Sequence, residues 1–265
     1  MKKISFFPFF SILTLMVMSS SCKKEVNLFT VSQDIEFGMQ MKEEIESNPD
    51  QYNVVYEKDA PEAYEHLNRV RDNILNSGEL KYDDRFTWEV YLIDNDTIVN
   101  AFACPGGYMY FYTGLIDFLD NEAQFAGVVA HEMAHVDLRH STKSMTKHYS
   151  YAILLNVLLG KNPSKMAEIA ADLALGLGNL QFSRTHEYQA DEYAVKYLYK
   201  TAYNAPSLAD FFEKLESSKR PPEFLSTHPS PENRYENINE VFQSLGGVNG
   251  ELFESRYQEF INALP

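Results

Sequence analysis

Residues 121–145, NEAQFAGVVAHEMAHVDLRHSTKSM, carry the pattern around which the rest of the chain is interpreted. Apolar residues dominate the first half, and Asp120 precedes it as the expected N-cap, so we predict one continuous helix. His131-Glu132-Met133-Ala134-His135 lies within that helix. Because residues four apart stand on the same helix face, His131 and His135 can chelate one Zn²⁺.

A second signal is needed, since by chance this pattern occurs in roughly one chain of this size in a hundred. The signal is Glu187, which lies 187 − 135 = 52 residues after the second histidine, on a helix predicted over 185–200. Asp191 follows one turn later and can hold a histidine by a hydrogen bond. The alternatives are two histidines on an unrelated helix and a solvated acidic face. Beside the histidine pair, we interpret Glu187 as the third zinc ligand.

The composition of the 265-residue chain excludes several classes of protein. Hydrophobic residues make up 45% and aromatic residues 14%, which excludes a disordered chain. Lys and Arg number 23 against 38 Asp and Glu, and the net charge of 23 − 38 = −15 argues against nucleic acid as a partner. Two cysteines are too few for a disulfide scaffold.

The N-terminal residues 1–21 have the layout of a bacterial secretory signal peptide, with Lys2 and Lys3 before a mostly apolar stretch. That stretch, 4–18, has 18 − 4 + 1 = 15 residues, short of the ~20 that span a bilayer. Small residues then lead to Cys22, which we predict to be the lipidated first residue of a lipoprotein. The alternative is a conventionally cleaved signal with an incidental cysteine.

The remaining chain is predicted to form a tether over 22–31 and one α+β, mostly α-helical domain over 32–265. Aromatic and β-branched runs, separated by Asp94-Asn95-Asp96 and Pro105-Gly106-Gly107, predict a small three-stranded antiparallel β-meander over 86–113 beside the active-site helix. Apolar periodicity predicts further helices. They are expected near 34–47, 62–76, 150–160, 166–182, 207–217, 231–245 and 251–263.

Four segments together carry a family resemblance. HEMAHVDLRHS and SRTHEYQADEYA surround the predicted ligands, NAFACPGGYMYFYTGLI covers 100–116, and THPSPENR covers 227–234. In this order they resemble metallopeptidase family forty-eight, the gluzincin group of CAAX prenyl endopeptidases, HtpX-type, Oma-type and bacterial periplasmic proteases. The similarity extends over about 32–245. Neither the multiple membrane spans nor the tetratricopeptide array of some relatives is found here, so the resemblance is to a small lipoprotein member.

The resemblance implies a gluzincin-like zinc metalloprotease domain with one Zn²⁺ per chain. It implies His131, His135 and Glu187 as ligands and Glu132 as the catalytic residue. It also implies Asp191 as a residue that supports the ligands. A zinc-activated water with Glu132 as general base would then hydrolyse a peptide bond.

Two further sites are predicted with alternatives left open. His228, held in a rigid loop by Pro229, is a second catalytic candidate that would donate to the oxyanion; the alternative is a loop histidine without a role. Arg234, nearby in sequence, is expected to support the site together with Asp191. Asn100-Ala101-Phe102-Ala103 is expected to be an edge strand that binds an extended peptide. The other histidines, at 66, 140, 148 and 186, are expected to be structural or solvent-facing; His140 follows His135 by five residues, which would place it on a different helix face. The apolar stretch 150–182 is expected to be packing, with a lid as the alternative.

The function predicted from these observations is a zinc endopeptidase that cleaves unfolded or misassembled proteins of the bacterial cell envelope. The lipid anchor would be its only membrane attachment, and we expect it in the outer membrane with the protein facing the periplasm. The alternatives are a non-catalytic, chaperone-like zinc-binding lipoprotein that holds unfolded envelope proteins, and a zinc hydrolase of non-peptide substrates. No feature of the sequence indicates an oligomeric state.

Overall fold

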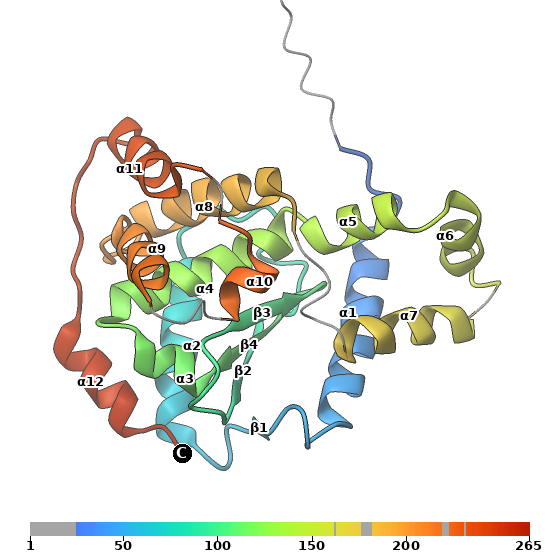
Figure 1. The fold of residues 1–265 in the computed structure, drawn as a ribbon, viewed down its shortest axis with the longest axis horizontal. Coiled ribbons are helices and arrows are strands. Elements are labelled where there is room, and N and C mark those ends of the chain that lie inside the picture. The colour runs from blue at the N-terminus through green and yellow to red at the C-terminus, as the bar shows by residue number, and fades with distance from the viewer. Residues whose placement is uncertain (1–24, 162, 176–181, 219–222, 231) are drawn as a thin grey trace, which may run out of the picture.

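The computed structural model describes residues 25–161, 163–175, 182–218, 223–230 and 232–265, and these confirm an α+β, mostly helical fold (Figure 1). Four short strands form one sheet: β1 (Val54–Val55), β2 (Glu89–Ile93), β3 (Ala101–Cys104) and β4 (Tyr108–Tyr112). The helices are α1 (Val31–Glu46), α2 (Pro61–Leu75), α3 (Thr113–Phe118), α4 (Glu122–Asp137), α5 (His140–His148), α6 (Tyr151–Leu158), α7 (Pro163–Leu175), α8 (Arg184–Tyr199), α9 (Ser207–Ser217), α10 (Phe224–Thr227), α11 (Arg234–Ser244) and α12 (Glu254–Asn262).

The predicted antiparallel meander is wrong, because the sheet is mixed and has the order β1-β2-β4-β3. β2 pairs with β4 in parallel, β3 pairs with β4 antiparallel, and β1 adds a short antiparallel pairing to β2. The strand nearest in sequence to β2 is therefore not its neighbour. β3 lies at an edge of the sheet, as predicted for 100–103.

The segment between β2 and β3 explains this topology. The backbone N–H of Asn95 donates to Thr113 Oγ1 at 2.9 Å, and the backbone oxygen of Asn95 accepts from Gly114 at 3.1 Å. The chain therefore passes across the start of α3 instead of turning back onto β2. A Cβ on Gly114 would lie 2.6 Å from the Asp96 carbonyl oxygen, so this crossing requires glycine.

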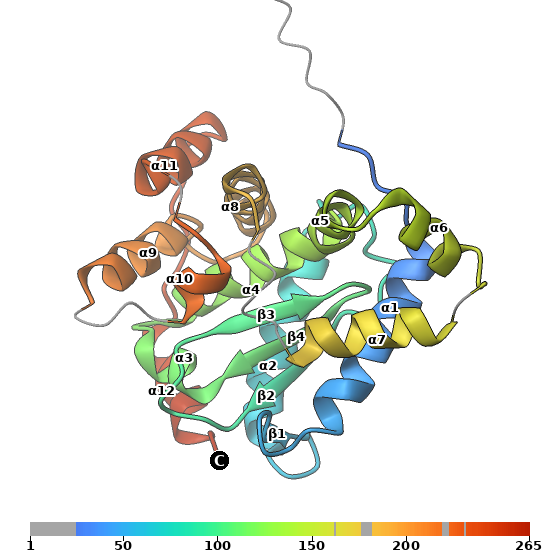
Figure 2. The same ribbon diagram turned by 45° about the vertical axis from the view of Figure 1, so that its right-hand side comes forward.

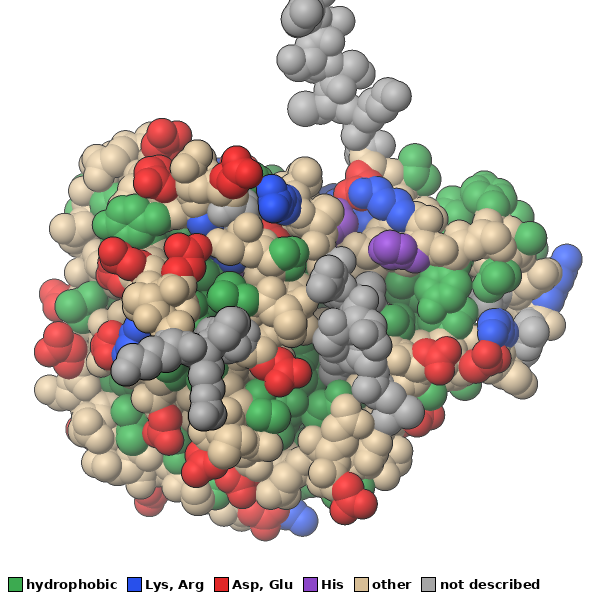
Figure 3. Space-filling view, viewed as in Figure 1, with side chains coloured by type: hydrophobic (Ala, Val, Ile, Leu, Met, Phe, Trp, Pro, Cys, Tyr) green, Lys and Arg blue, Asp and Glu red, His purple; other side chains and the backbone are tan. Residues whose placement is uncertain are grey.

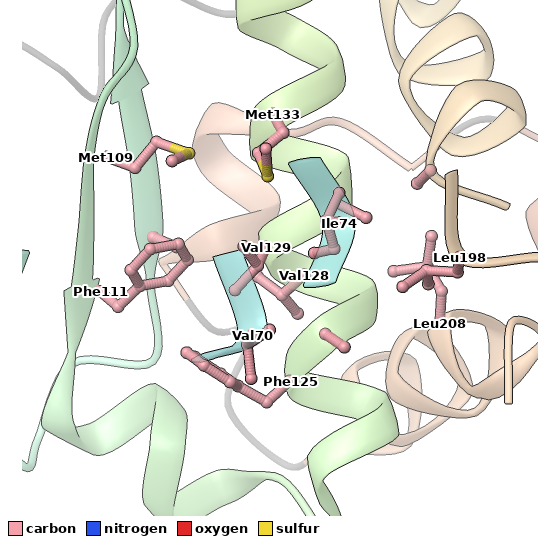
Figure 4. Packing of buried hydrophobic residues seen from close by; sticks show 14 of the residues in the cluster. Val70, Ile74, Met109, Phe111, Phe125, Val128, Val129, Met133, Leu198 and Leu208 are labelled. Carbon is pink, nitrogen blue, oxygen red and sulfur yellow. The ribbon is translucent and has the colours of Figure 1, made fainter. Parts of the chain in front are cut away.

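The two faces of the sheet pack against different helices. Met109 and Phe111 of β4 point into the main core, where Figure 4 shows them facing α4, with side chains of α2 close by. Residues labelled on these helices include Val70, Ile74, Val129 and Met133. Leu198 of α8 and Leu208 of α9 lie on the far side of α4. α4 is thus buried between the sheet and the C-terminal helices.

The opposite face of the sheet is rich in tyrosine and is covered by α1 and α7 (Figure 2). Because side chains alternate along a strand, Tyr108, Tyr110 and Tyr112 of β4 all point to this side. α1 comes close to the turn between β3 and β4: a Cβ on Gly38 would lie 1.7 Å from the Pro105 carbonyl oxygen. The two helical layers fix the position of β3 relative to α4.

The helix predicted over 121–145 is two helices, and its N-cap is Asn121 instead of Asp120. The side chain of Asn121 accepts a hydrogen bond from Gln124 N at 3.0 Å, and α4 begins at the next residue. α4 ends at Asp137 because Arg139 takes a left-handed conformation, with φ 59° and ψ 40°. The Arg139 guanidinium is hydrogen-bonded to the Asp34 carboxylate and to the Phe29 carbonyl oxygen, which hold it there.

The first described residues run along α5. Asn27 Nδ2 donates to Thr142 Oγ1 at 2.9 Å, and the Leu28 N–H donates to Thr146 Oγ1 at 3.2 Å. The predicted signal peptide and Cys22 lie outside the described residues, as does the start of the predicted tether. Within the described part of the chain, no helix is both long enough and apolar enough to cross a membrane.

Candidate metal centre

α4 carries the first part of the site. His131, Glu132 and His135 are all buried, and the helical spacing of four places both imidazoles on one face. Their Nε2 atoms lie 3.1 Å apart. Two imidazole nitrogens this close to each other can bind one metal ion together.

α8 supplies a carboxylate to the same point. Glu187 Oε2 lies 3.5 Å from His131 Nε2, and Glu187 Oε1 lies 3.4 Å from His135 Nε2. The N-cap of α8 is Ser183, whose side chain accepts from the backbone of His186, so the helix begins just before this residue. The structure therefore brings together the three side chains that the sequence predicted as ligands, from two helices that pack closely.

His228 lies in the same group, at the end of α10. Its Nδ1 is 3.4 Å from Glu187 Oε1 and 3.4 Å from His131 Nε2, and its Nε2 is 3.4 Å from Glu132 Oε1. The ring is stacked on Phe224, with centroids 4.3 Å apart. Donor atoms of His131, His135, Glu187 and His228 all lie within 4.8 Å of one another, so His228 joins the group of possible metal donors.

A buried ion pair stands behind the donors. Arg234 binds Asp191 through two hydrogen bonds of 2.7 Å, from Nε to Oδ2 and from Nη2 to Oδ1. Asp191 Oδ1 also lies 2.9 Å from His131 Nδ1. The same Arg234 Nη2 reaches Glu187 Oε2 at 3.3 Å, and the guanidinium lies 3.3 Å from the centre of the Phe212 ring. The two residues predicted to support the site therefore each contact a predicted ligand: Asp191 contacts His131, and Arg234 contacts Glu187.

The pKa values of the buried site residues are shifted in different directions. Burial raises the pKa of Glu132 and lowers the pKa of His135 well below its ordinary value. Burial also pushes the pKa of Glu187 upward, but the imidazoles of His228 and His135 outweigh it and hold that pKa well below its ordinary value. Glu187 is thus an anion and His135 neutral, the states in which both bind a metal ion.

His131 shows the opposite behaviour to His135. Burial acts to lower its pKa, but its hydrogen bonds with Asp191 and Glu187 raise the pKa to about 9. Because Nδ1 faces Asp191, the second proton of the ring is carried by Nε2, which points into the donor group. A proton and a metal ion therefore compete for the same atom.

Orphaned oxygen atoms show that the residues fit a cation. Both carboxylate oxygens of Glu132 and the Oε1 of Glu187 are buried and have no hydrogen-bond partner. Buried carboxylate oxygens are costly without a partner, which a cation between the imidazoles would supply. Two or three imidazole nitrogens and a carboxylate form a donor set typical of Zn²⁺.

His140 was expected to be structural or solvent-facing, on another helix face than His135; it is structural, and the expectation that it lies away from His135 is wrong. His140 is buried, and its Nδ1 lies 3.1 Å from His135 Nδ1, because the chain breaks at Arg139 and α5 starts in a new direction. Its Nε2 lies 3.0 Å from Gln189 Oε1. Nε2 must donate to that oxygen, so Nδ1 of His140 accepts the proton of His135 Nδ1. His140 thus orients a metal-donor histidine.

His186 was also expected to be structural or solvent-facing, and it is buried. Its ring stacks on His140 with centroids 4.3 Å apart, and its Nε2 lies 2.8 Å from the Glu25 carboxylate. His135, His140 and His186 therefore form a row of imidazoles that comes from α4, α5 and α8. The sequence could not predict this row, because periodicity describes the faces of one helix and not the contacts between helices.

A small, shallow apolar pocket opens beside the donor group. Phe102 and Ala103 of β3 line it on one side and His228 on another. Tyr112 N donates to the Asn100 carbonyl oxygen at 3.2 Å, so in the antiparallel register the backbone groups of Ala103 face away from β4. The Ala101 N–H is already taken by Asn100 Oδ1 at 2.9 Å. The predicted substrate strand therefore borders the site, with Ala103 as its open position.

Comparison with known proteins gives a family match. The model of Peptidase family M48 matches residues 43–241, which is most of the chain. The beta-barrel assembly-enhancing protease of Escherichia coli (strain K12) is 37% identical over 157 residues, which are 54% of this chain and 32% of the relative. Metalloprotease LoiP of the same organism is 32% identical over 175 residues, 60% of this chain and 64% of LoiP. Mitochondrial metalloendopeptidase OMA1 of Arabidopsis thaliana is 33% identical over 150 residues, which are 56% of this chain and 30% of the relative.

The chain belongs to Peptidase family M48, as the resemblance predicted. The family match and the buried donor group confirm the predicted zinc metallopeptidase class and the predicted zinc cofactor. The matched part spans about a third of the beta-barrel assembly-enhancing protease.

Proposed function

We propose that this member of family M48 is a zinc endopeptidase of the bacterial cell envelope that cleaves unfolded or misassembled envelope proteins. The observation that carries the proposal is the buried donor group on α4 and α8, with the unpartnered Glu132 carboxylate beside it. A purely structural metal site has no need of that buried carboxylate, which contributes no hydrogen bond to the fold.

In this proposal His131, His135 and Glu187 hold the zinc ion. Zinc, when bound, polarises the peptide carbonyl and lowers the pKa of water at the site. Glu132 then takes a proton from that water as general base and delivers it to the leaving amine nitrogen. Its raised pKa suits both steps, since a carboxylate of ordinary pKa would hold the proton too weakly.

His228 lies beside both the donor group and Glu132. A catalytic zinc site uses three protein ligands and one open position, so His131, His135 and Glu187 would hold the ion without His228. The His228 Nε2, 3.4 Å from Glu132 Oε1, would then be the group placed to donate to the carbonyl oxygen as that oxygen gains charge. This keeps the predicted catalytic role of His228 as part of the proposal.

The substrate would be an extended segment of polypeptide. A peptide added to the edge of β3 would hydrogen-bond to the backbone of Ala103 and pass the small apolar pocket beside His228. Main-chain pairing of this kind requires an unfolded or unpaired segment. We therefore expect cleavage in chains that have not folded.

The envelope location is supported by the sequence of residues 1–22 and by the relatives. Lipidation at Cys22 would attach the domain to a membrane, which we place at the outer membrane facing the periplasm. One relative is named as enhancing beta-barrel assembly, and barrels of this kind are outer-membrane proteins in bacteria. Unfolded polypeptides are thus the proposed partners, and nucleic acid is not one.

Cleavage of reduced casein by the metal-loaded chain tests the proposal, with the wild type compared to Glu132→Gln. We expect the substitution to lower kcat at least ~10²-fold while about one zinc per chain is retained. Glu192→Gln on α8, a half-buried carboxylate paired with Lys196 outside the donor group, is the matched control and should retain activity. Equal cleavage by wild type and Glu132→Gln would refute the proposed chemistry.

A further inference from the structure

α6 presents a line of large apolar side chains to solvent. On α6, Tyr151 is 65% and Leu155 40% exposed, and Leu159, just past the end of the helix, is 61% exposed. The Leu159 N–H donates to the Leu155 carbonyl oxygen at 3.0 Å, so the spacing of four residues places all three side chains along one side. We call these three residues the α6 stripe. On the inner side, Leu154 is fully buried and fixes the helix against the molecule. A contiguous exposed patch of this kind marks an interaction site in a folded protein.

The stripe lies beside the point where the described chain begins. Glu25 forms an ion pair with Lys147 of α5, and Asn27 and Leu28 are hydrogen-bonded further along the same helix. α5 ends at His148, three residues before Tyr151. Val26, at the start of the described chain, is itself 64% exposed. Figure 3 shows green side chains gathered over α6, with blue Lys and Arg side chains close by.

The sequence before residue 25 brings a bilayer to this place by either of two routes. If Cys22 is acylated, the lipid lies three residues from Glu25; if the apolar stretch 4–18 is retained, it lies only a few residues further away. Both routes attach a membrane next to α5 and α6. The length and position of this segment therefore favour a bilayer over any other occupant of the stripe.

Cationic side chains outnumber carboxylates around this point. Lys81, Arg139, Lys143 and Lys147 line one open polar pocket with Glu25 and Asp137; Glu25 is paired with Lys147, and Arg139 is paired with the neighbouring Asp34. The remainder of the chain is strongly acidic, with a net charge of −15 overall. Lys161 is exposed just after the stripe, whereas Glu168 of α7 is paired with Lys165. Basic side chains next to an apolar face are typical of helices that lie in a membrane interface.

We propose that the α6 stripe inserts into the interface of a bilayer that contains anionic lipids, with Lys143 and Lys147 against the headgroups. Eight residues of helix extend only ~12 Å, so α6 lies along the surface. The attached domain would then have one fixed orientation on the membrane instead of rotating about its N-terminal segment. This inference concerns a surface away from the donor group and holds whether or not the chain cleaves peptides.

The test uses the full chain as processed by a bacterial host, carrying Tyr151→Trp and bound to vesicles of phosphatidylethanolamine, phosphatidylglycerol and a brominated phosphatidylcholine. The native Trp88 is buried and provides a constant background. Tyr235→Trp on α11, at a tyrosine that is 46% exposed, is the matched control. An interfacial helix enters ~5–10 Å into the lipid, within reach of the bromine atoms, so we expect about twofold or stronger quenching at position 151 only. Equal quenching at both positions, or none at position 151, would overturn the proposal.

A second set of variants separates the contributions. Leu155→Glu with Leu159→Glu, placed in the Tyr151→Trp chain, should abolish the quenching, whereas Leu252→Glu, at a leucine 37% exposed, should not. Lys143→Gln with Lys147→Gln should weaken quenching only in vesicles that contain phosphatidylglycerol. Thermal melting and casein cleavage should be unchanged in each variant. If the glutamate pair instead converts a dimer to a monomer in sedimentation without altering the quenching, a second copy covers the stripe and the proposal is wrong.

Discussion

Asp191→Asn removes one charge from the buried pair behind the donor group while keeping the shape of the side chain. Asp191 accepts two hydrogen bonds of 2.7 Å from Arg234 and contacts His131 at 2.9 Å, and both Asp191 and Arg234 are buried. In the variant, Arg234 retains only the longer contact of 3.3 Å to Glu187 as a charged partner. His131 loses the carboxylate that orients its ring.

The expected magnitude follows from these contacts. Removing one partner of a buried ion pair costs about 3–5 kcal/mol, and we expect the lower end because the asparagine oxygen still accepts a hydrogen bond. For a domain of this size that free energy corresponds to a melting temperature lower by ~6–12 °C. Loss of the hydrogen bond to His131 should weaken zinc binding by about 10–100-fold.

The assay is thermal unfolding of the metal-free chain in chelator, followed by a zinc competition titration at neutral pH. Asp210→Asn, an exposed aspartate on α9, is the control. Asp191→Asn combined with Arg234→Met removes both charges and keeps contact with the Phe212 ring, so it should be more stable than Asp191→Asn alone. Melting of Asp191→Asn within about 1 °C of the wild type, or a double variant as unstable as the sum of its single changes, would refute the reasoning.

Three further predictions concern the other buried groups. His140→Phe keeps the stacking but removes the partner of His135 Nδ1, so zinc affinity should fall about tenfold in a competition assay; unchanged affinity would contradict the positioning role. His228→Ala should retain about one zinc per chain by elemental analysis, because three donors remain, whereas His135→Ala should lose it, and loss in both would show that His228 is indispensable for holding the ion. For Glu122, burial acts to raise the pKa, but hydrogen bonds from Arg256, Tyr203 and Arg69 outweigh it and lower the pKa below its ordinary value of 4.5. The stabilisation from Glu122 is therefore present above about pH 4.5 and lost as the pH falls through the lower folded-state pKa, so the difference in unfolding free energy between wild type and Glu122→Gln should shrink in acid, and a difference that grows in acid would contradict this.

The sheet marks one boundary of what sequence patterns reveal here. Three strand segments were predicted at nearly their observed positions, because alternation and β-branched residues are local properties. Their order was wrong, because Asp94-Asn95-Asp96 reads as a tight turn but lies across the start of α3. Which strands pair depends on contacts between segments distant in the chain, and turn residues do not encode those contacts.

The break after α4 marks a second boundary. Helical periodicity continues from Asn121 to Met145, and a left-handed arginine is rare enough that nothing in the sequence announced the change of direction at Arg139. Contacts with Asp34 and Phe29, more than a hundred residues earlier, hold it. The same break carries His140 onto His135, which the spacing of five on one continuous helix had excluded.

The sequence by itself determined that His131 and His135 share a helix face, since a spacing of four fixes that geometry whatever surrounds the helix. Together with the family motifs it also identified Glu187, Asp191 and Arg234 as their companions. Only the tertiary structure decided that His228 enters the donor group, that His140 supports it, and that β3 pairs with β4 alone and not with β2. These residues come from segments far apart in the chain, and their distances are set by how helices pack on the sheet, a property that no local pattern contains.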